Sequence, residues 1–308
     1  MIDFRYHLVS LISVFLALAV GVVLGAGPLQ NSLGTALNDQ VTSLRENRKA
    51  MQTQLEQTEA AVNDRDDYIA AAAAAYLPGT LEGKKVALAV LPEAKSDDID
   101  AIIAQLEAAG GTINGRVSLT TAWTAPSREA FRETYSGQLA GHLGKTVSTD
   151  GNGVLGEGLG AALTGDAQTA KQLMDLLTAT DAPLVSVDTR LNGPADMIVV
   201  IGPRSPDATE SRDSETTDSL AQAASSWAEA LTGTAAVSTT VVVGGADDET
   251  DAVSALRTAK AAVTTIDSVG QVAAAVSTPL ALVSTASGTK RHYGFDKGAD
   301  AVMPPLPK

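Results

Sequence analysis

The stretch KKVALAVLPEAKSDDIDAIIAQLEAAGGTINGRVSLT, residues 84–120, sets the fold class of this chain. Its first part, 86–91, is a short, almost wholly apolar run that is typical of a buried strand. Residues 96–111 then have the pattern of a helix, with Ser96 as the expected cap, acidic residues in the first turn and Gly110 at the end. A second strand is expected over 112–120. Strands that alternate with helices in this way indicate a mostly parallel sheet.

The same alternation continues toward the end of the chain. Further apolar strands are expected over 183–188, 196–202, 236–245 and 262–267. Further helices are expected over 127–143, 166–181, 217–233 and 247–260, and 268–277 continues the pattern. We therefore predict an α/β fold class: a mostly parallel, three-layer α/β ectodomain over residues 80–308, with helices on both faces of the sheet.

The N-terminal segment predicts a membrane anchor over residues 1–27. Leu8 to Ala26 carry no charge, and as a helix they would be about 28 Å long, against a hydrocarbon core of about 30 Å. A signal peptide has a shorter apolar region, and Leu24-Gly25-Ala26 is a poor cleavage site because Leu24 is not small. We expect a single, uncleaved transmembrane helix.

The residues around this helix predict its orientation. Arg5 and His7 precede it, whereas residues 27–44 contain no Lys or Arg, so the N-terminus is expected in the cytoplasm and the bulk of the chain outside. Asp3 can cap the helix, and Phe4 and Tyr6 suit the headgroup region of the bilayer. The expected location is the cell membrane rather than an outer membrane.

Residues 28–79 predict a long coiled-coil helix, which Pro78-Gly79 would end. Apolar residues recur at spacings of four and three from Leu37 to Tyr76, with polar residues between them. This pattern favours a parallel homodimer, and the alternative is one helix that folds back on its own domain. The expected dimerisation residues are Leu37, Val41, Leu44, Met51, Leu55, Val62 and Ile69.

Composition excludes several classes of function. The net charge of −14 leaves no basic stripe for a nucleic-acid partner. The chain has no cysteine, which removes disulfides, thiolate catalysis and thiolate metal sites. His142 and His292 lie in no recognisable nucleophile context, and G-x-S-x-G does not occur. We therefore expect a protein that is not an enzyme and has no resident cofactor.

Parallel sheets bind ligands at the carboxyl ends of their strands, and this chain has polar residues at those positions. The candidate strand-end pocket consists of Glu93, Asp188, Arg190, Arg204 and Asp247. The run 203–218 is expected to be a polar loop that is solvated or binds a partner. GNGVLG, residues 151–156, matches G-x-G-x-x-G, but the segment before it is polar, so we interpret it as a flexible loop rather than a cofactor loop. The weak copper candidates are His292 and Met303.

Two terminal segments carry a resemblance. DFRYHLVSLISVFLALAVGVVLGAGPL, residues 3–29, and the closing RHYGFDKGADAVMPPLPK, residues 291–308, resemble the actinobacterial family named after the mycobacterial copper transport protein B. This resemblance implies a protein of the mycolate-containing cell envelope. It implies copper export or channel formation, or a part in cell separation together with a membrane partner and a secreted peptidoglycan hydrolase.

The residues distinguish between these implied functions. A pore needs a closed barrel of amphipathic strands of about 9–11 residues, whereas the expected strands are short and apolar. Copper conduction needs Cys or Met clusters, and the five methionines are scattered. The expected function is therefore a dimeric envelope scaffold that regulates cell separation. Copper transport is the alternative, and an unrecognised ligand-binding or enzymatic domain is the third.

Overall fold

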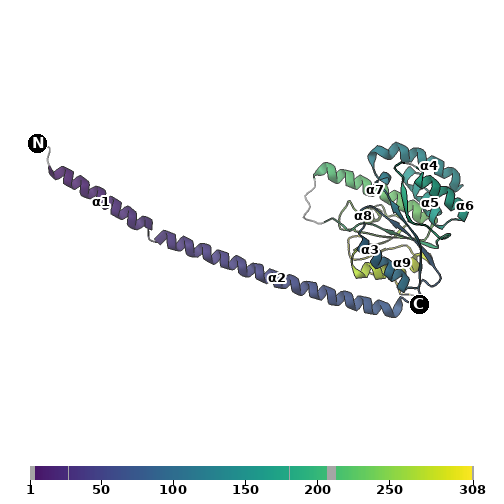
Figure 1. Cartoon of the computed structure of the whole chain (residues 1–308), viewed down its shortest axis with the longest axis horizontal. Coiled ribbons are helices and arrows are strands. Elements are labelled where there is room, and N and C mark those ends of the chain that lie inside the picture. The colour runs from purple at the N-terminus through teal and green to yellow at the C-terminus, as the bar shows by residue number, and fades with distance from the viewer. Residues whose placement is uncertain (1–3, 27, 180, 207–212, 307–308) are drawn as a thin grey trace. The chain divides into compact units, whose positions relative to one another are not determined.

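The computed structural model describes the chain except for residues 1–3, 27, 180, 207–212 and 307–308 (Figure 1). Its contacts divide the chain into two compact units, residues 1–65 and residues 66–308. The first unit contains α1 (Phe4–Ala26) and most of α2 (Pro28–Tyr76). The second unit contains the end of α2 and the α/β domain.

Helix α1 has the length and composition of a membrane span. Its segment Phe4–Val23 has a mean hydropathy of 2.3 over 20 residues. The next helix begins at Pro28, where a missing backbone N–H costs nothing because the first turn of a helix leaves that group unpaired. The predicted cap Asp3 lies outside the described residues.

The α/β domain is built on a seven-stranded sheet in the order β3-β2-β1-β4-β5-β6-β7. Neighbouring strands are parallel except β2 and β3, which are antiparallel. The predicted mostly parallel α/β fold is thus confirmed. The strands are β1 (Lys85–Val90), β2 (Thr112–Leu119), β3 (Val185–Thr189), β4 (Met197–Ile201), β5 (Thr240–Val243), β6 (Thr264–Ile266) and β7 (His292–Tyr293).

Helices cover both faces of this sheet (Figure 1). Central strand β4 shows why: Met197, Val199 and Ile201 contribute to one core, and Ile198 and Val200 contribute to the other. The first core is covered by α3 (Ser96–Ala108) and α9 (Val272–Ala286). The second is covered by α4 (Glu129–Leu143), α5 (Gly151–Thr164), α6 (Ala167–Thr178), α7 (Ser214–Val237) and α8 (Ala252–Thr258).

The interpretation of residues 151–156 as a flexible loop is wrong, because they form the first part of the buried helix α5. Its glycines allow close contact with α7. A Cβ on Gly156 would lie 1.8 Å from the carbonyl oxygen of Ala230, and a Cβ on Gly233 would lie 2.0 Å from that of Gly153. Thr234 Oγ1 donates a hydrogen bond of 3.0 Å to the carbonyl of Gly156. Glycine here serves helix packing and not backbone freedom.

Some predicted helix boundaries also need correction. Ser96 is the first helical residue and not the cap: Lys95 holds the cap position, without a side-chain hydrogen bond. Helix α7 is longer than predicted because Asp213 caps it, accepting a hydrogen bond from the Thr216 N–H at 2.7 Å. The helix predicted over 247–260 forms only over 252–258, since residues 247–251 make turns.

The end of α2 packs on α9. Ala73 and Leu77 are each 1% exposed and pack against Val276 and Leu280. The last turns of this long helix therefore belong to the α/β unit. For this part of the chain, the contacts agree with the alternative prediction that the helix packs on its own domain.

Candidate functional site: the strand-end pocket and the closing turn

The direction of β3 separates the predicted pocket residues. Val185 at the start of β3 pairs with Leu119 at the carboxyl end of β2, so β3 runs toward the opposite edge of the sheet. Asp188 and Arg190 are therefore carried away from the carboxyl ends of the parallel strands. Asp188 accepts a hydrogen bond of 2.6 Å from Ser118 Oγ and pairs with Arg116 Nε at 3.3 Å. The prediction that these two residues join the pocket is corrected.

A cavity of about 590 Å³ lies where the parallel strands change their order, between the carboxyl ends of β1 and β4. We call this cavity the strand-end pocket. Glu93 and Arg204 line it, whereas Asp247 lies outside its lining. Its wall comes from the segments after β1, β2 and β4, from helix α7 and from the start of α8. Open α/β sheets bind their ligands at such a crevice.

Arg204 is held firmly at this pocket. Its Nε and Nη2 donate to the two carboxylate oxygens of Asp98 at 2.8 and 2.5 Å, and Asp98 is 3% exposed. The hydrogen bond to Asp98 raises the pKa of Arg204. A Cβ on Gly270 would lie 2.3 Å from Arg204 Nε, so a side chain at position 270 would clash with this guanidinium. Arg204 is thus largely neutralised by its own partner.

The Ser205 hydroxyl is also occupied. It donates to Asp251 Oδ2 at 2.5 Å and accepts from the Asp247 N–H at 3.1 Å. Burial raises the pKa of Asp251, although the hydrogen bond from Ser205 opposes that change. The lining residues include no histidine that could take a proton from this hydroxyl. The partner of the Ser205 hydroxyl is therefore a carboxylate and not a histidine.

Trp227 in the pocket wall stacks on a second tryptophan, Trp123. The rings of Trp123 and Trp227 stack with centroids 5.9 Å apart. The indole N–H of Trp123 donates to the Leu184 carbonyl at 2.7 Å. Trp227 lines the pocket, and its N–H has no acceptor among the residues that the structure describes. Trp227 was not predictable as a pocket residue, because nothing in the sequence of its helix distinguishes a pocket residue from a core residue.

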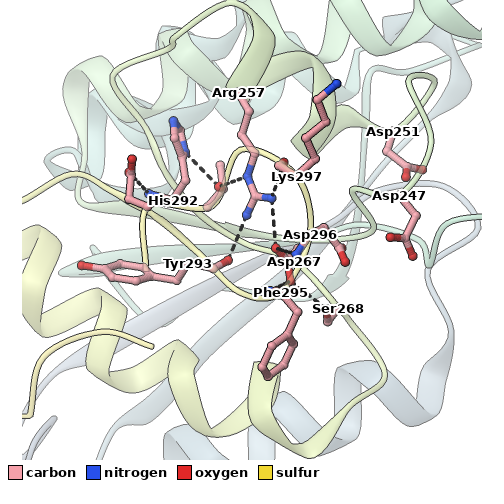
Figure 2. Close-up of polar contacts among 12 residues, drawn as sticks. Asp247, Asp251, Arg257, Asp267, Ser268, His292, Tyr293, Phe295, Asp296 and Lys297 are labelled. Carbon is pink, nitrogen blue, oxygen red and sulfur yellow. Dashed lines mark hydrogen bonds and ion pairs between the residues drawn. The ribbon is translucent and has the colours of Figure 1, made fainter. Parts of the chain in front are cut away.

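A second polar centre holds the closing turn, residues 294–300 (Figure 2). The buried carboxylate of Asp267 accepts hydrogen bonds from the N–H groups of Phe295 and Asp296, at 2.8 and 3.0 Å, and from Ser268 Oγ at 2.6 Å. Arg257 Nη1 pairs with the same carboxylate at 3.0 Å. This arrangement satisfies the buried charge of Asp267 from several sides.

The guanidinium of Arg257 connects the closing turn to the sheet. It donates to the carbonyls of Tyr293 and Lys297 at 2.9 and 3.2 Å (Figure 2). Asp296 lies beside Asp267 and Asp247, and burial, together with these two carboxylates, raises its pKa to about 6. Asp247, predicted in the pocket, thus contributes to this second centre.

Of the two candidate copper ligands, His292 is held by another contact and Met303 is exposed. His292 Nδ1 forms a hydrogen bond of 2.9 Å with Thr265 Oγ1, and burial lowers its pKa. Met303 is 43% exposed. The described part of the chain contains no group of three or more His, Asp or Glu side chains that could hold a metal ion.

The expected dimerisation residues divide between the two units of the chain. Ile69 is partly buried and packs against the cluster formed by Ala73, Leu77, Val276 and Leu280. The others are exposed on α2 of the single chain: Leu37, Val41, Leu44, Met51, Leu55 and Val62. The structure contains one chain, so the dimer remains a prediction.

This chain matches one protein family and several mycobacterial proteins. Residues 1–304 match the model of the family described as "Copper transport outer membrane protein, MctB". Proteins named copper transporter MctB from Mycobacterium tuberculosis strain H37Rv and Mycobacterium bovis are each 32% identical to this chain over 173 residues. The Mycobacterium leprae protein of the same name has the same identity over the same length. Each match spans about half of both proteins, 55% of this chain and 55% of the relative.

Proposed function

The chain belongs to the family of the copper transport outer membrane protein MctB, and from this membership we propose that it acts in copper transport at the cell envelope. The observation that carries this proposal is the extent of the family match. It includes the apolar helix α1, the long helix α2 and almost all of the α/β domain, so the match is not confined to one part of the chain.

We further propose that α1 anchors the protein in the cell membrane. A single apolar helix satisfies its own backbone hydrogen bonds and can therefore span a bilayer alone. Arg5 lies in the first turn of α1, before its uncharged run, and residues 27–44 contain no Lys or Arg; both features favour a cytoplasmic N-terminus. The α/β domain then lies outside the cytoplasm.

In this proposal copper is the cargo of a transport process, and the α/β domain assists that process without holding copper in a fixed site. Cu(I) prefers converging thiolates and thioethers. The chain has no cysteine, and Met197, which is 5% exposed, packs in the sheet core. The domain is also proposed to be non-enzymatic, since the Ser205 hydroxyl is already paired with Asp251.

Growth in rising copper concentrations tests this function. A strain that lacks the gene should lose copper tolerance, and the full chain should restore it. A variant with His142→Ala, His292→Ala, Met197→Leu and Met303→Leu should restore it equally well. A deletion strain with unchanged tolerance would contradict the copper function. A folded ligand variant that fails to restore tolerance would contradict the proposed indirect role.

A second candidate function is a dimeric scaffold in cell separation, working with a membrane partner and a peptidoglycan hydrolase or its regulator. The exposed apolar residues of α2 support it, since Leu44 is 67% and Met51 is 71% exposed in the single chain. Apolar residues in a heptad pattern are stabilised when a partner helix covers them. Microscopy of septa tests this candidate. The deletion strain would be complemented by chains that keep or lack the exposed apolar residues of α2.

A further inference from the structure

We propose that the strand-end pocket binds a zwitterionic small molecule, namely an amino acid or a short peptide with an apolar side chain. The pocket volume of about 590 Å³ lies within the range of about 300–1,000 Å³ that is usual for small-molecule sites. The position also fits, because the cavity opens between β1 and β4, where the strand order changes direction.

The apolar part of the wall defines one end of the ligand. Leu91, Pro203, Leu220 and Trp227 line the cavity, and Leu220 is 38% exposed there. Trp227 is only 8% exposed, and its indole N–H has no acceptor among the described residues. Because no described protein group accepts it, this N–H can donate to a ligand oxygen, and a hydrogen bond of that kind contributes about 0.5–1.5 kcal/mol.

The charges of the wall define the other end. Arg204 is paired with Asp98, and Asp251 accepts the Ser205 hydroxyl, so neither offers a free charge. Glu93 and Lys95 differ from them: within the described chain neither has an ion-pair partner. They have opposite charges and lie two residues apart on one loop of the pocket wall. A ligand with both an ammonium and a carboxylate group would pair with both of them, whereas an anion or a cation would pair with one and be repelled by the other.

The backbone of this loop supports a binding role for Glu93. Its φ is +65°, a left-handed conformation that glutamate rarely adopts and that costs about 1 kcal/mol or more. The Glu93 side chain is exposed and has no partner among the described residues, so no contact within the described chain accounts for this backbone conformation. The neighbouring Asp97, in the first turn of α3, disfavours a phosphate at this edge.

Calorimetric titration of the full chain in detergent tests this inference. The probes are free leucine, the dipeptide Ala-Leu, N-acetyl-Ala-Leu, Ala-Leu-amide and inorganic phosphate. We expect saturable binding of Ala-Leu, affinity at least tenfold weaker for each blocked dipeptide, and no binding of phosphate. The copper function does not depend on this pocket, so either proposal can fail without the other.

Matched variants identify the groups that recognise the ligand. With Glu93→Gln, the free and N-acetylated dipeptides should bind equally; with Lys95→Gln, the free and amidated dipeptides should bind equally. Trp227→Phe keeps the ring, removes the N–H and should weaken binding of all three. Glu107→Gln and Lys145→Gln, at exposed positions outside the pocket lining, should change nothing. The proposal is overturned if neither free leucine nor Ala-Leu binds, if blocked and free dipeptides bind equally to the wild type, or if phosphate binds in their place.

Discussion

Several glycines lie where another part of the chain comes so close that a Cβ atom would clash with it. A Cβ on Gly294 would lie 1.9 Å from Asp267 Oδ1, and its φ of +130° is one that glycine adopts readily. The sequence contains the Tyr293-Gly294 pair as part of its closing segment. The reason for the glycine could not be predicted, because Asp267 is distant in sequence and reaches the closing turn only in the folded sheet.

Gly156→Ala should destabilise the protein by about 3 kcal/mol or more, because the new Cβ would meet the Ala230 carbonyl oxygen at 1.8 Å and force α5 and α7 apart. Gly137→Ala is the matched control: it lies in α4 with no atom within 4 Å of the new Cβ. This control should stabilise the helix by about 0.5–1 kcal/mol. Urea unfolding of both variants measures the difference, and equal stabilities would contradict the packing role of the α5 glycines.

Asp296→Asn should raise the melting temperature at pH 7–8 and leave it nearly unchanged near pH 4. The folded-state pKa of Asp296 is about 6, above its ordinary value of 3.8. Its ionisation is therefore harder in the folded state, and stability is lost as the pH rises from about 4 to about 6. Asparagine does not ionise, so the variant does not lose stability over this pH range. Asp181→Asn, at an exposed position, serves as the control in a series of thermal melts, and parallel pH profiles for wild type and Asp296→Asn would refute the expectation.

Among the secondary-structure elements, those with a strong local pattern were predictable. Strands β1, β4 and β5 are continuous apolar runs with turn residues at their ends, and all three form in the central sheet. The antiparallel direction of β3 has no local signal, and the pocket prediction failed for Asp188 and Arg190 for that reason. Helix α5 was missed because its many glycines reduce helix propensity, and their value arises only from contact with α7.

The exposed apolar stripe of α2 leads to a prediction about self-association. Leu44→Glu with Leu55→Glu should convert a dimer into a monomer, since a desolvated seam does not tolerate unpaired carboxylates. Thr53→Glu with Ala60→Glu places the same charges outside the 4-3 pattern and should leave the dimer intact. Light scattering of residues 29–308 measures the mass of each. A dimeric Leu44/Leu55 variant would place the contact elsewhere in the chain.

For the whole chain, the absence of cysteine makes the membrane orientation directly testable. A cysteine introduced at exposed Glu215 should react with an impermeant maleimide on intact cells, because the α/β domain is expected outside. A cysteine at Tyr6 should react only after lysis, since this residue lies before the uncharged run Leu8–Ala26, at the end of α1 that is expected to face the cytoplasm. The reverse pattern of labelling would invert the proposed topology.

The order of the parts along the chain was also predictable: an apolar helix, a long helix, and then an α/β domain with the terminal segments that resemble the family. The strand-end pocket itself was predictable only in outline. Glu93 and Arg204 were identified from their positions after β1 and β4. Trp227 and Ser205 depend on how α7 and the loop after β4 pack over the sheet, which no local pattern encodes.

Retention of copper inside cells tests the proposed transport function most directly. Wild-type, deletion and complemented cells would be loaded with copper, washed and followed by mass spectrometry of their copper content. We predict that the deletion strain retains several times more copper than the wild type and that the full chain restores the wild-type content. A chain without residues 4–26 should fail to restore it, although the protein is produced. Equal copper contents in deletion and wild-type cells would contradict a function in copper transport.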